Sequence, residues 1–452
     1  MSKIQMSRLR ELRTDDNGAE AACPAIIFTL RIGGNALGGV ADKAPGTLQR
    51  AVDAAVNVFE VFGRSLRARM GLLILVALHL LSAICVAGWI GRPYHSGMVA
   101  NGALIALTLM PAFLCVASAW RCLDIVIRIR PNRPLLWLWN DVRQVLCNVE
   151  RLAGGAVVLL ILLVFMGSFA FLKESIPAIN PFSWDKYFEY LDRVLHGGHQ
   201  PFELLWPLLG GSVVTAAINF LYNIWFFILF FIVITVAFSA SRPTLQRTFL
   251  YAFVLTWSLG GNLLATIFSS AGPAYFARLG LGDGFEPLMA SLRSFADVVP
   301  VWALGTQDTL WQAYTGSDAA IAGISAMPSM HVASSVLFVL YGFGVSRRIG
   351  WPLVAFAVAI FLGSIHLGWH YAVDGYMGVV VALAAWWMAV RLQRRRVWYS
   401  IDDALRRFER RPAAAGHDWG RDRFIGVPHG RAQSFLAAPP PGAGRKDPLL
   451  SE

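Results

Sequence analysis

The residues best suited to chemistry lie in two short segments, and the second of these, residues 370–374, reads HYAVD. If this segment is helical, the i, i+4 spacing places His370 and Asp374 on one face, one turn apart. A carboxylate in that position can accept a hydrogen bond from one imidazole nitrogen and leave the other nitrogen free and basic. The spacing therefore indicates a nucleophilic or general-base histidine. The competing interpretation is a plain helix start, where Asp374 interacts with the positive end of the helix dipole.

The first segment reads SAMPSMH and ends at His331. Pro328 suits the first turn of a helix, with Ser325 or Ala326 at the cap. Ser329 and the free backbone N–H groups of such a turn can bind a phosphate group. His331, just inside the turn, could then give a proton to a leaving oxygen. The alternative is a simple helix entry with a buried polar pair.

The composition indicates that membrane helices position these residues. Of 452 residues, 56% are hydrophobic and only 15% are charged, whereas soluble domains carry about 25% charged residues. This composition excludes a mainly disordered chain and argues against a water-soluble protein. Eight apolar stretches approach the length of about 20 residues that a helix needs to cross a bilayer. They are residues 71–90, 97–119, 153–172, 208–238, 249–268, 329–345, 351–367 and 371–390. We therefore expect an all-α, polytopic membrane protein with about eight transmembrane helices.

The positive charges indicate how these helices are oriented. The formal net charge is +11, which in a soluble chain would suggest nucleic-acid binding. Here Lys and Arg concentrate before residue 70, in the 120–152 connection and after residue 390. The alternate connections contain few cations, which are Arg92, Lys173, Lys186, Arg193, Arg278 and Arg293. The positive-inside rule then predicts a multi-pass inner (plasma) membrane protein with both termini in the cytoplasm, and no nucleic-acid partner.

The predicted topology brings the two segments to one face of the membrane. One predicted span starts just before His331 and runs inward, and the next returns outward to His366. His370 and Asp374 follow directly, so they arrive at the same outer edge as His331 although 39 positions separate the two histidines. We therefore expect a site on the periplasmic or extracellular side.

The chain divides into four predicted parts. Residues 1–68 form a cytoplasmic N-terminal region, in which the apolar spacing at 46–69 predicts an amphipathic helix on the membrane surface. Residues 69–152 contain two accessory transmembrane helices and a basic cytoplasmic connection, and residues 153–392 form a six-helix core. Residues 393–452 are rich in Arg, Asp, Ala and Pro, which predicts a mostly disordered cytoplasmic tail.

Together, the two segments resemble the motifs of the type 2 phosphatidic acid phosphatase superfamily. The sequences PSMH and HYAVD, at this spacing and on this membrane face, are most similar to its inositolphosphotransferase branch, which includes inositol phosphorylceramide synthase. The stretches 192–201 and 270–273 are also similar to features of bacterial members of that branch. The resemblance covers roughly residues 153–392. It implies a six-helix phosphatase-type core that acts on a lipid phosphate or phospholipid in the bilayer.

The resemblance also implies a role for each residue of the two segments. His370 would attack phosphorus and form a phosphohistidine, while Asp374 would orient and stabilise it. His331 would protonate the leaving group and then activate the acceptor, and Ser329 would hydrogen-bond the phosphoryl oxygens. Water as acceptor would make the protein a lipid phosphatase, and a lipid alcohol would make it a phosphotransferase. The family implies no metal and no other cofactor.

The sequence lacks the cations with which the superfamily surrounds phosphate. Where the Lys-x6-Arg-Pro motif would lie, residues 265–273 read ATIFSSAGP, and the Arg expected six residues before the nucleophile is Ser364. Phosphoryl transfer needs positive charge or hydrogen-bond donors around the equatorial oxygens. Arg278 and Arg293 in the outer loop, together with His366, are the candidates to bind the substrate instead.

Three other classes of protein compete with this interpretation. A membrane transporter commonly places ionisable groups near the bilayer midplane, but the spans at 153–172 and 249–268 contain no charge. A metal enzyme could use His366, His370 and Asp374 at i, i+4 and i+8, but two helical turns spread these side chains over about 12 Å. A catalytically inactive membrane scaffold would account for the missing Lys and Arg. The polar cluster at one membrane edge favours chemistry on a lipid head group.

Overall fold

The computed structural model describes residues 45–239, 241–316 and 323–394, and within these ranges every regular element is helical. A helix satisfies its backbone hydrogen bonds within one segment, which is what an apolar chain in lipid requires. The predicted all-α fold is therefore confirmed. The predicted tail after residue 394 and the N-terminal region before residue 45 lie outside the described residues. The division into four parts stays a prediction.

Seven described helices are long and apolar enough to cross a membrane, and they correspond to seven of the eight predicted spans. The eighth, α14 (Met330–Val345), is apolar but has only 16 residues. It rises about 24 Å, less than the hydrocarbon core of about 30 Å. The seven are α3 (Met70–Ile90), α4 (Gly97–Asp124) continued by η1 (Ile125–Ile129), α6 (Val149–Ile179), α9 (Ser212–Ala237), α10 (Pro243–Ser258) continued by η2 (Leu259–Leu264) and α11 (Ala265–Ile267), α15 (Arg347–His366) and α16 (Ala372–Arg394).

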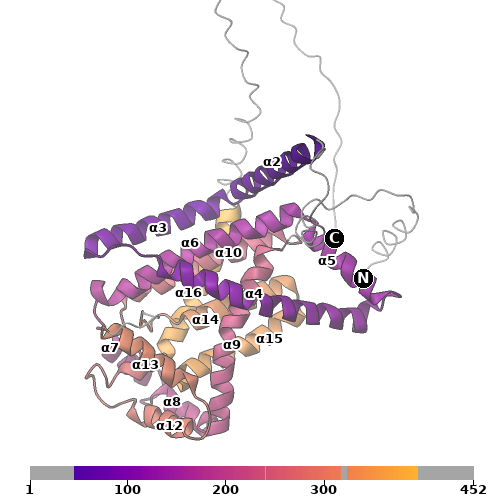
Figure 1. Ribbon diagram of the computed structural model, residues 1–452. Coiled ribbons are helices and arrows are strands. Elements are labelled where there is room, and N and C mark those ends of the chain that lie inside the picture. The colour runs from indigo at the N-terminus through magenta and orange to yellow at the C-terminus, as the bar shows by residue number, and fades with distance from the viewer. Residues whose placement is uncertain (1–44, 240, 317–322, 395–452) are drawn as a thin grey trace, which may run out of the picture. The chain divides into compact units, whose positions relative to one another are not determined.

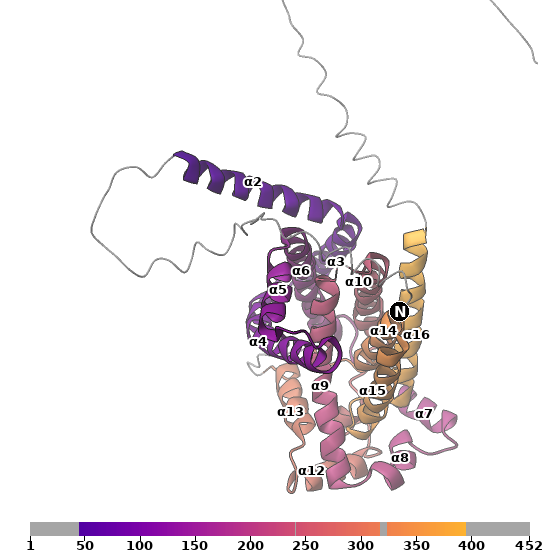
Figure 2. The same cartoon turned by 90° about the vertical axis from the view of Figure 1, so that its right-hand side faces the viewer.

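Shorter helices occupy the connections. The helix predicted over 46–69 is α2 (Pro45–Arg67), and α5 (Pro134–Leu146) follows η1. The span predicted at 208–238 starts later than expected, because Gly210 and Gly211 separate α9 from a short helix before it. Figures 1 and 2 show four of the connecting helices gathered at one end of the bundle. These are α7 (Asp185–Leu195), α8 (Pro201–Leu209), α12 (Glu286–Ala296) and α13 (Trp302–Tyr314), and the 3-10 turn η3 (Pro273–Tyr275) lies in the same connection as the last two.

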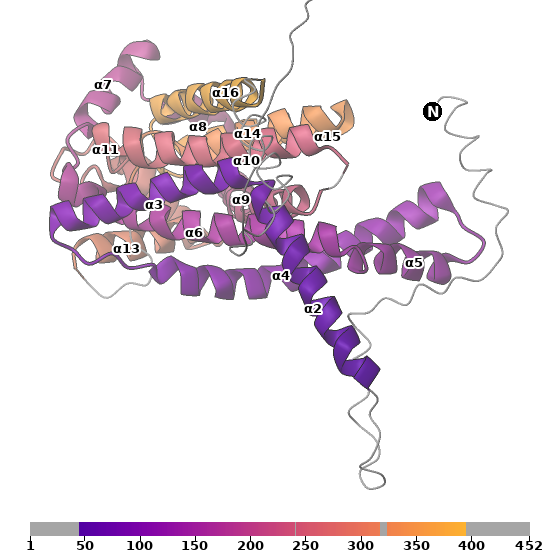
Figure 3. The same cartoon turned by 90° about the horizontal axis from the view of Figure 1, so that it is seen from above.

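The helix α16 packs closely on α10 and α14 through small residues. Ala382, Ala385 and Ala389 are fully buried, and α16 runs alongside α10 (Figure 3). At Gly378, a Cβ atom would come within 2.7 Å of the Ser329 carbonyl oxygen. Small residues allow membrane helices to approach each other closely. The start of α14 is therefore held directly against α16.

A buried histidine joins α3 to the rest of the bundle. The two ring nitrogens of His79 lie 2.8 Å from Ser168 Oγ of α6 and 3.0 Å from Asn262 Oδ1 of η2. Polar groups inside a membrane bundle are costly unless they pair with one another. The contact shows that α3, which was predicted to be accessory, is bonded to α6 and to the helix that continues α10.

We expect Gly378→Ala to destabilise the protein, because the added methyl group meets backbone that cannot move away easily. Overpacking of this kind costs about 1–3 kcal/mol. Gly88→Ala on α3 is the matched control, because a Cβ there meets no atom within 4 Å. Thermal unfolding of both variants in detergent micelles measures the difference. Equal midpoints for the two variants would contradict the close packing of α14 on α16.

Candidate active site

The first segment enters α14 through Ser329. The helix begins at Met330, so Ser329 is its N-cap, and the Ser329 Oγ accepts a hydrogen bond from Val332 N–H at 3.4 Å. The prediction of Ser325 or Ala326 at the cap was therefore wrong. Pro328 precedes the helix because the chain stays extended through Ser329, whose φ and ψ are −66° and 110°.

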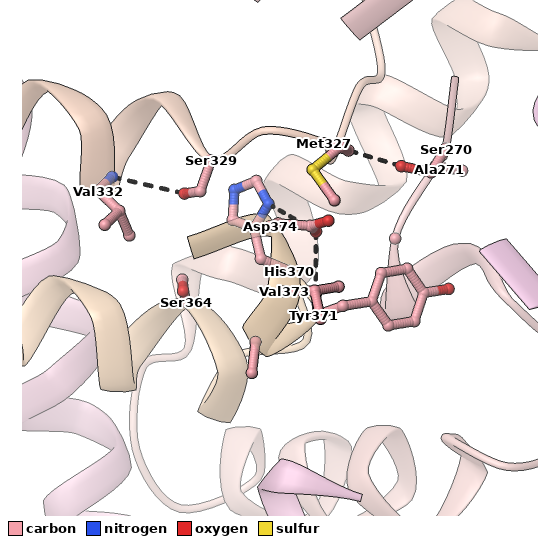
Figure 4. A network of polar contacts seen from close by, with 12 residues as sticks. Ser270, Ala271, Met327, Ser329, Val332, Ser364, His370, Tyr371, Val373 and Asp374 are labelled. Atoms are coloured by element: carbon pink, nitrogen blue, oxygen red, sulfur yellow. Dashed lines mark hydrogen bonds and ion pairs between the residues drawn. The ribbon is translucent and has the colours of Figure 1, made fainter. Parts of the chain in front are cut away.

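The second segment forms the start of α16 and brings its two functional side chains together. His370 Nδ1 lies 3.3 Å from Asp374 Oδ2, which also accepts from Tyr371 N–H at 3.0 Å (Figure 4). Asp374 is thus both the partner of His370 and an acceptor in the first turn of a helix, so this geometry is compatible with both interpretations of the spacing. Ser364, which stands where an Arg was expected, accepts the His370 N–H with its carbonyl oxygen at 3.1 Å.

The two segments are bonded directly to each other. Ser329 N–H donates to the Asp374 carbonyl oxygen at 2.9 Å, and Figure 4 shows both residues beside the imidazole of His370. His370 is 7% exposed and lies just outside the membrane helices α15 and α16. Burial lowers its pKa to about 3, the Lys173 ammonium acts in the same direction, and the Ala326 carbonyl opposes them. A neutral imidazole whose Nδ1–H donates to Asp374 leaves Nε2 as a free lone pair.

His331 is held in an aromatic setting from α9. Its ring centroid lies 4.5 Å from that of Tyr222 and 4.1 Å from that of Trp225, whose indole N–H donates to the His331 carbonyl oxygen. Tyr222 also stacks on Trp369, the neighbour of His370. His331 and His370 are close enough to interact electrostatically. The Nε2 atom of His331 is buried without a hydrogen-bond partner.

Two buried aspartates of α7 support the start of α16, and the sequence had assigned them no role. Asp192 accepts the N–H groups of Ala372 and Val373 at 2.7 and 3.0 Å. Asp185 accepts the Tyr371 hydroxyl at 2.9 Å, as well as the N–H groups of residues 271 and 272. Each is 1% exposed, and burial raises the pKa of both. Their seven-residue spacing, two helical turns on one face of α7, was the available signal.

His366 points away from the His370–Asp374 pair. Its Nε2 lies 2.8 Å from Thr215 Oγ1 of α9, and its ring packs near Trp206. The side chain is fully buried and its Nδ1 has no hydrogen-bond partner. In the described part of the chain, no group of three or more His, Cys, Asp and Glu side chains is placed to hold a metal ion.

The two predicted arginines are engaged elsewhere. Arg278 pairs with Asp308 and lies over the Trp311 ring, 5.7 Å from its centroid. Arg293 pairs with Glu286 in the same helix, α12. Among the described residues, neither arginine forms a hydrogen bond or ion pair with the two histidine segments. Their predicted role in substrate binding therefore gains no support from the geometry.

A different cation lies on α6, against the segment that leads to Ser329. Lys173 is near the C-terminal end of α6, and a Cβ at Gly323 would lie 3.2 Å from its Cγ. Its charge acts on both His331 and His370. The sequence showed Lys173 only as an outer-face positive charge that follows the charge-free stretch 153–172.

The fold and the site define a class of protein: an all-helical, multi-pass membrane protein with a His–Asp pair bonded to a Ser-capped helix. Residues 187–388 match the family model of the PAP2 superfamily, whose members are generally phosphatases or phosphotransferases. The match runs from α7 into α16 and includes both histidine segments, but not α6. This match supports the predicted resemblance to the superfamily over residues 187–388, while the inositolphosphotransferase branch stays a prediction. No curated protein and no solved structure matches the chain.

The raised pKa of Asp192 predicts a pH-dependent stability. Its pKa of about 6 in the folded protein compares with about 3.9 for an unfolded aspartate. The folded chain holds this proton more tightly, so its stability falls as the pH rises from about 4 through 6. This proton contributes up to about 3 kcal/mol to the total fall in the free energy of unfolding over that range. We expect Asp192→Asn to remove this contribution and so to make the pH dependence flatter.

Unfolding in detergent micelles between pH 4 and pH 8 measures this slope. The exposed Asp297 provides a matched control as Asp297→Asn. A slope in Asp192→Asn equal to that of the wild type would contradict the assignment.

Proposed function

We propose that this protein is an integral-membrane lipid phosphatase or phosphotransferase that works through a phosphohistidine on His370. The observation that carries the proposal is the buried His370–Asp374 pair, bonded through Asp374 to the Ser329 cap, inside a segment that matches the PAP2 superfamily. The substrate class is a lipid phosphate or phospholipid in the surrounding bilayer.

In the first step, the Nε2 lone pair of His370 attacks phosphorus. A P–N bond forms as the P–O bond to the leaving group breaks. Asp374 accepts the Nδ1–H of His370 and stabilises the positive charge that develops on the ring. Protonated His331 gives its proton to the leaving oxygen, and the cap at Ser329 donates to the phosphoryl oxygens.

In the second step, the acceptor hydroxyl gives its proton to His331 and attacks the phosphohistidine. A new P–O bond forms and the P–N bond breaks, which restores neutral His370. Water as acceptor releases phosphate, and a lipid alcohol gives a new phosphoester. Both acceptors share the first step, so the catalytic residues do not distinguish them.

We further propose an orientation for the protein. The Lys and Arg side chains concentrate on one set of connections, and the positive-inside rule assigns that set to the cytoplasm. The connections that contain α7, α8, α12 and α13 then face the periplasm or the extracellular space. The site at the start of α16 shares that side, in an inner (plasma) membrane protein whose termini are both cytoplasmic.

We expect His370→Ala to lower phosphoryl release or transfer by at least about 10³-fold, because the nucleophile is lost. Lipid analysis of cells that express wild type or His370→Ala identifies the donor and the product together. Acid treatment of the phosphorylated, purified protein tests the intermediate. A phosphohistidine loses its phosphate in acid, whereas a phosphoester keeps it. His199→Ala, at an exposed histidine between α7 and α8, is the control. Equal lipid profiles for wild type and His370→Ala would contradict the proposed function.

The proposed reaction needs no metal ion, since a histidine and an aspartate of this chain supply the nucleophile and its charge stabilisation. We expect the rate of the purified protein to stay within about twofold after treatment with excess chelator. Loss of activity that added Mg²⁺ or Mn²⁺ restores would instead indicate metal-assisted phosphoryl transfer.

A further inference from the structure

The proposed chemistry leaves one requirement unmet. Phosphoryl transfer concentrates negative charge on the equatorial oxygens, which positive charge stabilises in addition to the hydrogen-bond donors of the Ser329 cap. Arg278 and Arg293 are held by Asp308 and Glu286. A cation close to His370 must therefore come from another part of the fold.

The segment that leads into the Ser329 cap passes directly over Lys173. At Gly323, φ is +102°, and a Cβ would lie 3.2 Å from Lys173 Cγ and 3.4 Å from the backbone nitrogen of Glu174. Glycine allows both this backbone conformation and this close approach. Three residues later, Ala326 N–H donates to the Ser270 carbonyl oxygen at 2.9 Å, which fixes the segment just before the cap.

The ammonium group of Lys173 has no counter-ion in the described part of the chain. The neighbouring Glu174 carboxylate faces His95 at 3.8 Å, and no hydrogen bond or ion pair joins Lys173 to another described residue. Its side chain is half-buried. Partly desolvating a charge without a partner is unfavourable, so this position favours an anionic ligand.

The charge of Lys173 influences both histidines of the proposed site. It acts on both His331 and His370, and the contact with Gly323 places the Lys173 stem against the segment that leads to Ser329. None of the three buried carboxylates of the site forms an ion pair with Lys173 among the described residues: Asp185 and Asp192 accept backbone N–H groups, and Asp374 Oδ2 faces His370. The ammonium thus remains available to an anionic ligand.

We propose that Lys173 binds the non-bridging oxygens of the phosphoryl group that His370 attacks. Lysine binds phosphate as a compact point charge. This inference rests on the proposed function, and it extends the site to α6, outside the segment that matches the PAP2 superfamily. The Lys173 cation then serves where the superfamily motif of Lys and Arg is missing from the sequence.

Three variants test the inference: Lys173→Met, Lys173→Arg, and the control Lys186→Met at an exposed lysine of α7. Two probes are used. The first is orthovanadate, which is an analogue of free phosphate, and the second is dioleoyl phosphatidic acid in mixed micelles. We expect Lys173→Met to weaken orthovanadate binding at least about tenfold and to lower kcat/KM about 10²-fold. Lys173→Arg should recover most of both losses, and Lys186→Met should match the wild type.

The stability of the unliganded variants separates a binding role from a structural one. Removing an uncompensated cation should leave the melting temperature of Lys173→Met equal to or above that of the wild type. A clear drop that Lys173→Arg also shows would overturn the inference. So would unchanged orthovanadate binding, or a loss for the lipid alone, because Lys173 would then contact another part of the lipid.

Failure of the proposed function gives a different pattern. If orthovanadate binding depends on Lys173 while the wild type and His370→Ala give identical lipid profiles, the anion site is supported and the proposed reaction is contradicted. If His370→Ala abolishes turnover while Lys173→Met binds orthovanadate as well as the wild type, the reaction stands and the role of Lys173 falls. A wild type that binds no orthovanadate overturns the Lys173 site.

Discussion

The hydrogen bond from Ser329 N–H to the Asp374 carbonyl oxygen is the contact on which the candidate site depends. It joins the first turn of α16 to the cap of α14, and the missing side chain at Gly378 allows the two helices to come that close. The backbone at the start of α16 is bonded on its other side by Asp192. The start of α16, and His370 with it, is therefore held by hydrogen bonds to its backbone from the cap of α14 and from Asp192 of α7.

The buried carboxylates around the start of α16 have different hydrogen-bond partners and therefore different roles. The carboxylates of Asp185 and Asp192 are buried but fully engaged by N–H and O–H donors, so they hold backbone and do not neutralise a cation. Asp374 belongs to His370. An anionic substrate that enters such a region meets three carboxylates, and a nearby uncompensated ammonium offsets their repulsion.

The all-helical fold and the pairing of His370 with Asp374 could be predicted from the sequence, because the first follows from composition and the second from local spacing. The positions of the helix starts could not, since Gly210, Gly211 and the extended Ser329 act through one or two residues of backbone geometry. The roles of Asp192 and Lys173 were also missed. Asp192 bonds to the start of α16, and Lys173 packs against Gly323. Both contacts join segments that are distant in sequence, so the residue spacing within one helix could not predict them.

The short length of α14 determines how deep the chemistry lies. Its neighbours α15 and α16 have 20 and 23 residues, against 16 for α14. A helix about 24 Å long spans too little of a hydrocarbon core of about 30 Å, so hydrophobic mismatch makes the bilayer thin around it or leaves its ends recessed. If the inner end of α14 sits at the usual depth, the reaction proposed for His331 takes place below the plane of the head groups. A lipid can then present its phosphate by sinking a few ångströms, without withdrawing its acyl chains from the membrane.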